Sequence, residues 1–102
     1  MTKNTAKYGL KTEYWTAILS ILKSNPRVSE VILYGSRAKG NYKLGSDIDI
    51  CLKGNDLSLS DLTALMVKLD ELDLPWIIDL ANFNQITNSD LIDHIDRIGI
   101  EL

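Results

Sequence analysis

Short β-type runs alternate with stretches of helical periodicity along this chain, and this alternation most constrains its fold. It favours a two-layer α/β (α+β) domain in which helices pack on one face of a small mixed sheet. The first two strands have no helix of ordinary length between them, so we predict that they pair antiparallel. The predicted elements are a helix over residues 12–24, a strand over 28–34, a loop over 37–46 with room for one helical turn at its start, a strand over 47–52, a helix capped by Ser58, a strand over 76–80 and a last helix capped by Ser89.

The length of 102 residues corresponds to one domain. Residues 1–11 are polar, and we predict that they form a loose N-terminal tail ahead of a domain over residues 12–102. Cys51 is the single cysteine, so no intrachain disulfide can form. We expect it to be a buried, reduced thiol.

The net charge of -3 and the pI of about 5.0 argue against autonomous DNA binding, which needs a basic face. No stretch approaches the roughly 20 apolar residues of a membrane span. The polar start of the chain lacks the apolar segment of a signal peptide. Together with the single cysteine, these features predict a cytoplasmic protein.

Asp47 and Asp49 stand two residues apart on one face of the second predicted strand. Their backbones are then about 7 Å apart, close enough for the side chains to converge. Strands are depleted in Asp, and neighbouring carboxylates repel each other. A divalent cation such as Mg²⁺ would relieve this repulsion. A strand edge at which both carboxylates are solvated explains the pair equally well.

Asp79 interrupts an otherwise apolar run, Trp-Ile-Ile-Asp-Leu. A buried carboxylate without a partner is strongly unfavourable. If the third strand lies beside the second, Asp79 can join Asp47 and Asp49 around the same cation. The alternative is a salt bridge from Asp79 to a Lys or Arg.

Gly35 and Ser36 end the first predicted strand and open a tight turn. Glycine lets the backbone approach an anion closely, and the N–H groups of such a turn can bind phosphate. Arg37, Lys39 and Lys43 flank the turn and could neutralise phosphate charge. The alternatives are a plain turn and a solvated loop. We expect the one histidine, His94, to lie on the surface.

The combination is more specific than its parts: Gly35-Ser36, ten residues, Asp47-Ile48-Asp49, and Asp79 on a later strand. It resembles the signature of the DNA polymerase β-like nucleotidyltransferases. In detail, the segments Gly-Ser-Arg-Ala-Lys-Gly and Ser-Asp-Ile-Asp-Ile look like the minimal nucleotidyltransferase (MNT) family. The resemblance covers roughly residues 12–98 and implies a palm-like nucleotidyltransferase domain.

The resemblance also implies an activity and its partners. Asp47, Asp49 and Asp79 would be catalytic metal ligands for Mg²⁺, with two ions expected and Mn²⁺ as a substitute. Gly35 and Ser36 would hold a nucleoside triphosphate, with ATP expected. Many members pair with a HEPN-family toxin and neutralise it by attaching AMP to a hydroxyl, with tyrosine the leading candidate.

Two questions stay open at this point. The alternative to an enzyme is a catalytically silent nucleotide-binding or regulatory subunit that neutralises a HEPN partner by contact. The sequence also does not decide between a monomer, a homo-oligomer and a hetero-oligomer.

Overall fold

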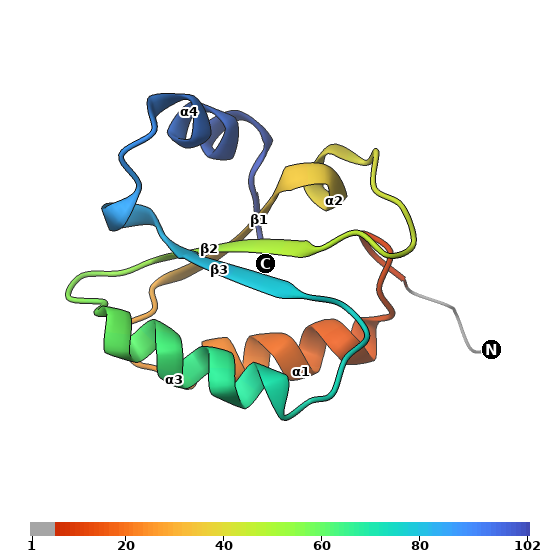
Figure 1. Ribbon diagram of the computed structural model, residues 1–102, viewed down its shortest axis with the longest axis horizontal. Helices are drawn as coiled ribbons and strands as arrows, with labels where there is room; N and C mark the ends of the chain where they lie inside the picture. Colours follow the sequence, from red (N-terminus) through yellow and green to blue (C-terminus); the bar gives the residue numbers. More distant parts are fainter. Residues whose placement is uncertain (1–5) are drawn as a thin grey trace.

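A mixed four-stranded sheet crosses the middle of the molecule in the order β3-β2-β1-β4 (Figure 1). The structure is a computed structural model that describes residues 6–102. β1 (Glu30–Tyr34) pairs antiparallel with β2 (Ile48–Lys53) and with the short β4 (Ile100–Glu101). β2 pairs parallel with β3 (Ile78–Asn82), which is an edge strand. The α+β class, the mixed sheet and the antiparallel first pair are therefore confirmed.

Helices lie on both sides of this sheet (Figure 1). α1 (Thr12–Leu22) and α3 (Leu59–Asp70) cover one face, as the predicted layers require. α2 (Gly35–Lys39) and α4 (Ser89–Ile98) lie on the other side. The prediction that helices pack on one face of the sheet therefore holds for α1 and α3 but not for α2 and α4. No helix within residues 6–102 has both the length and the apolar character needed to cross a membrane.

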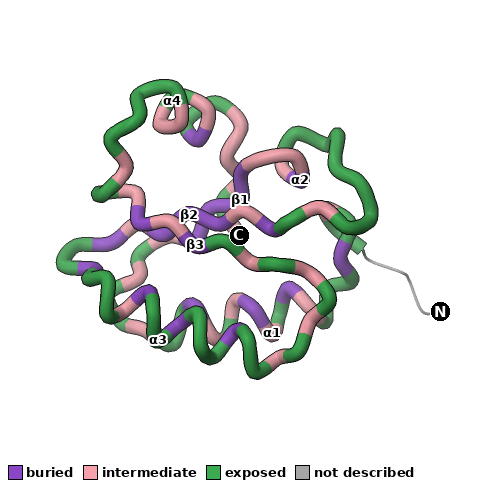
Figure 2. The backbone as a smooth tube through the Cα atoms, in the orientation of Figure 1, coloured by how far each residue is buried: buried purple, intermediate pink, exposed green. Residues whose placement is uncertain are grey.

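The alternation of side chains along the strands explains why both faces need cover. The main core lies between the sheet and α1 and α3, and Figure 2 shows the buried residues concentrated there and along the strands. Its most buried members are Ile18, Leu22, Val31, Leu33, Ile48, Ile50 and Leu52. The opposite face carries a smaller cluster in which Ile95 of α4 packs with Ile32, Tyr34 and Cys51.

Part of the predicted N-terminal tail is ordered against the domain. Leu10 is only 1% exposed and belongs to the main core. Lys7 and Leu10 exchange backbone hydrogen bonds of 2.8 and 3.0 Å, and Trp15 Nε1 donates to the Lys7 carbonyl at 2.8 Å. The prediction of a loose tail is therefore wrong for residues 7–10, because the side chain of Leu10 is buried in the main core. Residues 1–5 of that prediction lie outside the described residues.

The element ends differ from the predicted ones by a few residues. β3 begins two residues later than predicted, and η1 (Phe83–Gln85) follows it directly. Asn88 rather than Ser89 caps α4, because its Oδ1 accepts from the backbone N–H groups of Asp90 and Leu91. β4 was not predicted, since two residues carry no periodicity that could reveal a strand.

Cys51 is fully buried as a free thiol, as predicted. Burial raises the pKa of this thiol to about 11, so it is protonated and unreactive at neutral pH.

The predicted capping box of α3 is present and can be tested. Ser58 Oγ accepts from the Asp61 N–H at 3.1 Å, and Asp61 Oδ2 accepts from the Ser58 N–H at 3.0 Å. Ser58→Ala removes one of these bonds and should lower the free energy of unfolding by about 1 kcal/mol in urea denaturation. Ser60→Ala, an exposed change within the same helix, is the control and should alter stability by less than about 0.5 kcal/mol. Equal effects of the two changes would contradict the capping role.

Candidate active site

The register of three adjacent strands brings two of the predicted carboxylates together. Asp49 lies opposite Tyr34 of β1 on one side and opposite Asp79 of β3 on the other. Residues paired in register project from the same sheet face. Asp49 and Asp79 are therefore neighbours on the face that α2 and α4 flank. Asp47 immediately precedes β2, and its charge acts on Asp49.

Asp79 lies on the open edge of the sheet and is exposed to solvent. It is therefore not the buried carboxylate that an apolar strand suggested, because β3 is the edge strand of the sheet that residues 6–102 form. The salt bridges found within residues 6–102 are Arg27–Asp61 and Arg97–Asp93, so the alternative of an ion pair for Asp79 does not apply.

Asp49 is at the centre of a negative cluster. Burial raises the pKa of its carboxyl above the usual value, and the charges of Asp79 and Asp47 raise it further, while His94 lowers it. The same environment raises the pKa of Tyr34 to about 12, through burial first and then through Asp49 and Asp79. Bound cations would relieve this mutual repulsion.

Gly35 packs directly against this cluster at the start of α2. Its φ of +74° lies in the left-handed region, and a Cβ at this position would overlap Asp49 Oδ2. Only glycine meets both conditions. Ser36 follows in the first turn of α2 and is half-buried. The predicted phosphate turn and the predicted metal ligands are thus in contact.

His94 contacts the turn, which the sequence interpretation missed. Its Nε2 accepts a hydrogen bond from the Gly35 N–H at 3.1 Å, and its ring packs edge-on against Tyr34 with centroids 6.2 Å apart. The predicted surface role for His94 is therefore wrong. The spacing of apolar residues along the last helix could have predicted this contact, because His94 shares a face of α4 with Leu91 and the buried Ile95.

Arg37, predicted to contact phosphate, is instead buried, with 1% of its surface exposed. Its guanidinium donates to the carbonyl of Tyr8 at 2.8 Å, of Ser46 at 2.8 and 3.1 Å, and of Leu44 at 3.4 Å. Burial lowers the pKa of Arg37, but an arginine remains charged under these conditions. The guanidinium is thus committed to holding the loop that leads to Asp47.

Two aromatic rings complete the surroundings of Arg37. Its guanidinium carbon lies 5.2 Å from the centroid of Tyr42 and 5.8 Å from that of Trp76, distances typical of cation–π contacts. Trp76 Nε1 donates to the Leu44 carbonyl at 3.1 Å. These contacts join the loop before Asp47 to the segment that leads into β3, and so position both strands that carry the carboxylates.

Lys39 and Lys43 are exposed near the end of α2 and in the following loop. Their role as phosphate ligands stays a prediction.

The three carboxylates do not form a closed metal centre. Within residues 6–102, no three His, Cys, Asp or Glu side chains are gathered tightly enough to hold a metal ion by themselves. Mg²⁺ is commonly bound by one or two carboxylates together with water and substrate phosphates. The oxygen donors, their mutual repulsion and the adjacent glycine turn suit an ion shared with a phosphate group.

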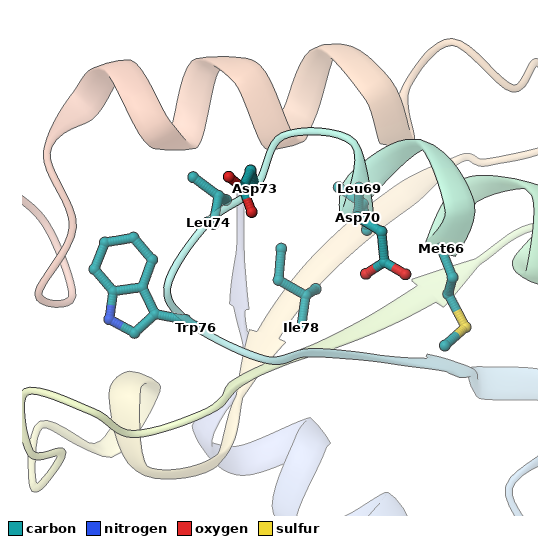
Figure 3. A pocket seen from close by; sticks show the side chains of 7 residues that line it. All are labelled: Met66, Leu69, Asp70, Asp73, Leu74, Trp76 and Ile78. Atoms are coloured by element: carbon teal, nitrogen blue, oxygen red, sulfur yellow. The ribbon is translucent and has the colours of Figure 1, made fainter.

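A separate pocket lies on the opposite sheet face and does not belong to this site. It is formed between α3 and the segment leading into β3, where Met66, Asp70 and Ile78 line it (Figure 3). Ile78 points toward the helices, whereas Asp79 projects from the other face of β3.

The site thus combines carboxylates at two adjacent parallel strands with a glycine turn, which is the arrangement expected of a nucleotidyl-transferring domain. The chain belongs to the family described as Polymerase beta, Nucleotidyltransferase, whose model matches residues 16–102. Comparison of the sequence with curated proteins found no relative.

Solved structures add closer likenesses. A toxin–antitoxin with AMP-PNP is 27% identical with a TM-score of 0.69, over 84% of this chain and 69% of that one. A mutant of the toxin–antitoxin MntA-HpeT is 27% identical with a TM-score of 0.70, over 86% and 70% of the two chains. A tri-AMPylated Shewanella oneidensis HEPN toxin in complex with MNT antitoxin has a TM-score of 0.66 at 22% identity, over 88% and 69%, and supports the fold.

Gly35→Ala tests the contact between the turn and Asp49. The added Cβ overlaps the Asp49 carboxylate, and the alanine must also adopt a left-handed φ. We therefore expect a loss of at least about 2 kcal/mol of unfolding free energy. The control is Gly40→Ala, where φ is +92° but, among residues 6–102, no atom outside the adjoining chain lies within 4 Å of the Cβ. Chemical denaturation should show the smaller loss for Gly40→Ala, and equal losses would contradict the close contact.

Arg37→Lys tests the network around the loop. A lysine keeps the charge, but its donors all lie on one nitrogen and cannot reproduce the fork with which Nε, Nη1 and Nη2 reach the carbonyls of Tyr8 and Ser46. We therefore expect a loss of about 2–4 kcal/mol in denaturation. Amide exchange over residues 40–47 should increase. The control is Arg97→Lys, at a residue whose side chain is 66% exposed, and it should cost less than about 1 kcal/mol. If Arg37→Lys leaves stability unchanged but weakens nucleotide binding, the original prediction that Arg37 contacts phosphate is correct.

Proposed function

We propose that this chain transfers AMP from ATP to a hydroxyl of a partner protein, a HEPN-family toxin, and thereby acts as an antitoxin. The observation that carries the proposal is the register of Asp49 with Asp79, with Gly35 packed against Asp49. The family match and the likeness to toxin–antitoxin structures, one of them with AMP-PNP, support it.

Asp47, Asp49 and Asp79 would hold the divalent metal, for which we propose two Mg²⁺ ions with Mn²⁺ as a substitute. When bound, the metal neutralises phosphate charge and stabilises the attacking and leaving oxygens of an in-line displacement. Gly35 and Ser36 would bind the triphosphate through the turn, where a backbone without a Cβ allows close approach. Lys39 and Lys43 would neutralise charge on the β- and γ-phosphates from the exposed loop.

The acceptor oxygen would attack the α-phosphorus, forming a new P–O bond as the bond to the bridging oxygen of pyrophosphate breaks. Asp79 is suited to orient the acceptor hydroxyl and to take its proton, because it is exposed on an edge strand that a second protein can approach. Tyrosine is the acceptor we propose. The reaction would take place in the cytoplasm, which supplies ATP and keeps Cys51 reduced.

The double variant Asp47→Asn, Asp49→Asn tests the activity. Transfer of label from α-labelled ATP to a purified HEPN-family toxin, with Mg²⁺ present, should fall by at least about a thousandfold, because the metal loses two of its anionic ligands. The control is Asp70→Asn, Asp73→Asn, which removes two carboxylates from the pocket on the opposite face and should leave transfer unchanged.

Toxin neutralisation should be measured with the same variants. If the Asp47, Asp49 variant neutralises the toxin as well as the unaltered chain does, the contact-only alternative is correct. An unaltered chain that transfers no label to the toxin would overturn the proposed activity.

A further inference from the structure

Three large apolar side chains are exposed beside the carboxylate cluster. Leu44 is 88% exposed, Ile77 is 68% exposed and Tyr42 is 36% exposed. We call these three residues the apolar rim. Leu44 and Tyr42 lie in the loop before Asp47, and Ile77 immediately precedes β3. Scattered exposed apolar residues are ordinary on protein surfaces, so the rim needs further support before it indicates a binding surface.

The backbone that carries Leu44 is firmly held. The carbonyl of Leu44 accepts from Trp76 Nε1 at 3.1 Å and from Arg37 Nη2 at 3.4 Å. Around it, the Ser46 N–H donates to the Lys43 carbonyl at 3.0 Å, and the Lys43 N–H donates to Ser46 Oγ at 2.8 Å. These bonds fix the backbone at Leu44 in the conformation that leaves its side chain exposed to water.

Ile77 and Tyr42 are held in the same way. The Ile77 carbonyl accepts from the Ile48 N–H at 2.9 Å, which fixes the entry of β3 against β2. The ring of Tyr42 packs on the buried guanidinium of Arg37. A preorganised apolar surface loses little conformational entropy when a partner covers it.

The position of the rim relates it to the reaction. Ile77 lies two residues before Asp79 and on the same strand face, and Leu44 lies three residues before Asp47. The indole hydrogen bond from Trp76 to Leu44 keeps the two segments side by side. A protein that presents a hydroxyl to Asp79 at the open edge can therefore contact the rim at the same time.

We propose that the apolar rim is the surface on which the acceptor protein docks, so that apolar side chains next to its acceptor residue place the hydroxyl beside Asp79. The inference rests on the proposed transfer to a protein. A nucleotide base is a poorer occupant, because bases bind in concave pockets and Leu44 projects into solvent. A second copy of this chain on the rim would block the approach to Asp79.

The test compares two pairs of apolar residues that are each more than half exposed. Leu44→Ser, Ile77→Ser removes most of the rim. The matched control is Leu59→Ser, Val67→Ser on α3, where the two residues are 82% and 56% exposed. The probe is a purified HEPN-family toxin with α-labelled ATP. The rim variant should raise the KM for the toxin by about tenfold or more, while kcat, ATP affinity and melting temperature stay unchanged. The control should leave all four unchanged.

Three outcomes would overturn the proposal. The first is a KM for the toxin that changes equally in both variants or in neither. The second is a loss of ATP affinity in the rim variant, which assigns the rim to the nucleotide. The third is a dimer of the unaltered chain in light scattering that the rim variant abolishes, which assigns the rim to a second copy.

The failure of the docking surface is distinguishable from the failure of the proposed function. Calorimetric binding of the toxin to both variants measures docking even without transfer. If the unaltered chain binds the toxin but transfers no label, the proposed activity fails. If it transfers label and the rim variant matches it, only the docking surface fails.

Discussion

The buried guanidinium of Arg37 is the interaction on which the arrangement of the site depends. It ties the carbonyls of Tyr8, Leu44 and Ser46 to α2, and it lies within cation–π distance of two aromatic rings, one of which belongs to the segment that leads into β3. A buried charge without such partners would be strongly unfavourable. Its donors therefore fix two chain segments, the one at Tyr8 and the loop of Leu44 and Ser46 that leads into β2, relative to the helix that begins at Gly35.

The carboxylate cluster has the opposite character, because its members repel one another. Burial and the charges of Asp79 and Asp47 raise the pKa of Asp49, which means that the folded domain disfavours the ionised form. Gly35 brings a turn into contact with this cluster where any larger residue would collide. The domain thus holds a strained set of charges in place, and a cation with phosphate would relieve the strain. Such a tension between stability and activity is common at catalytic sites.

The second layer of helices links the cluster to the smaller core. α4 packs Ile95 against the sheet face that carries Asp49, and this packing brings His94 to the Gly35 amide. The same face would have been solvated had helices covered only one side of the sheet. α4 therefore both closes a core and contacts the turn, while the edge strand β3 leaves Asp79 open to a partner.

Local sequence patterns establish the order of the elements from α1 to α4, the antiparallel first pair and the motif from Gly35 to Asp79. Periodicity and turn chemistry are local properties, and they can be read from neighbouring residues. The burial of Arg37, the contact of His94 with Gly35 and the exposure of Asp79 emerge only in the folded domain. The hydrogen-bond partners of Arg37 lie up to 29 positions away, and His94 and Gly35 are 59 positions apart. The exposure of Asp79 depends on which strand forms the edge. Such pairings follow from how the layers pack, which local patterns do not encode.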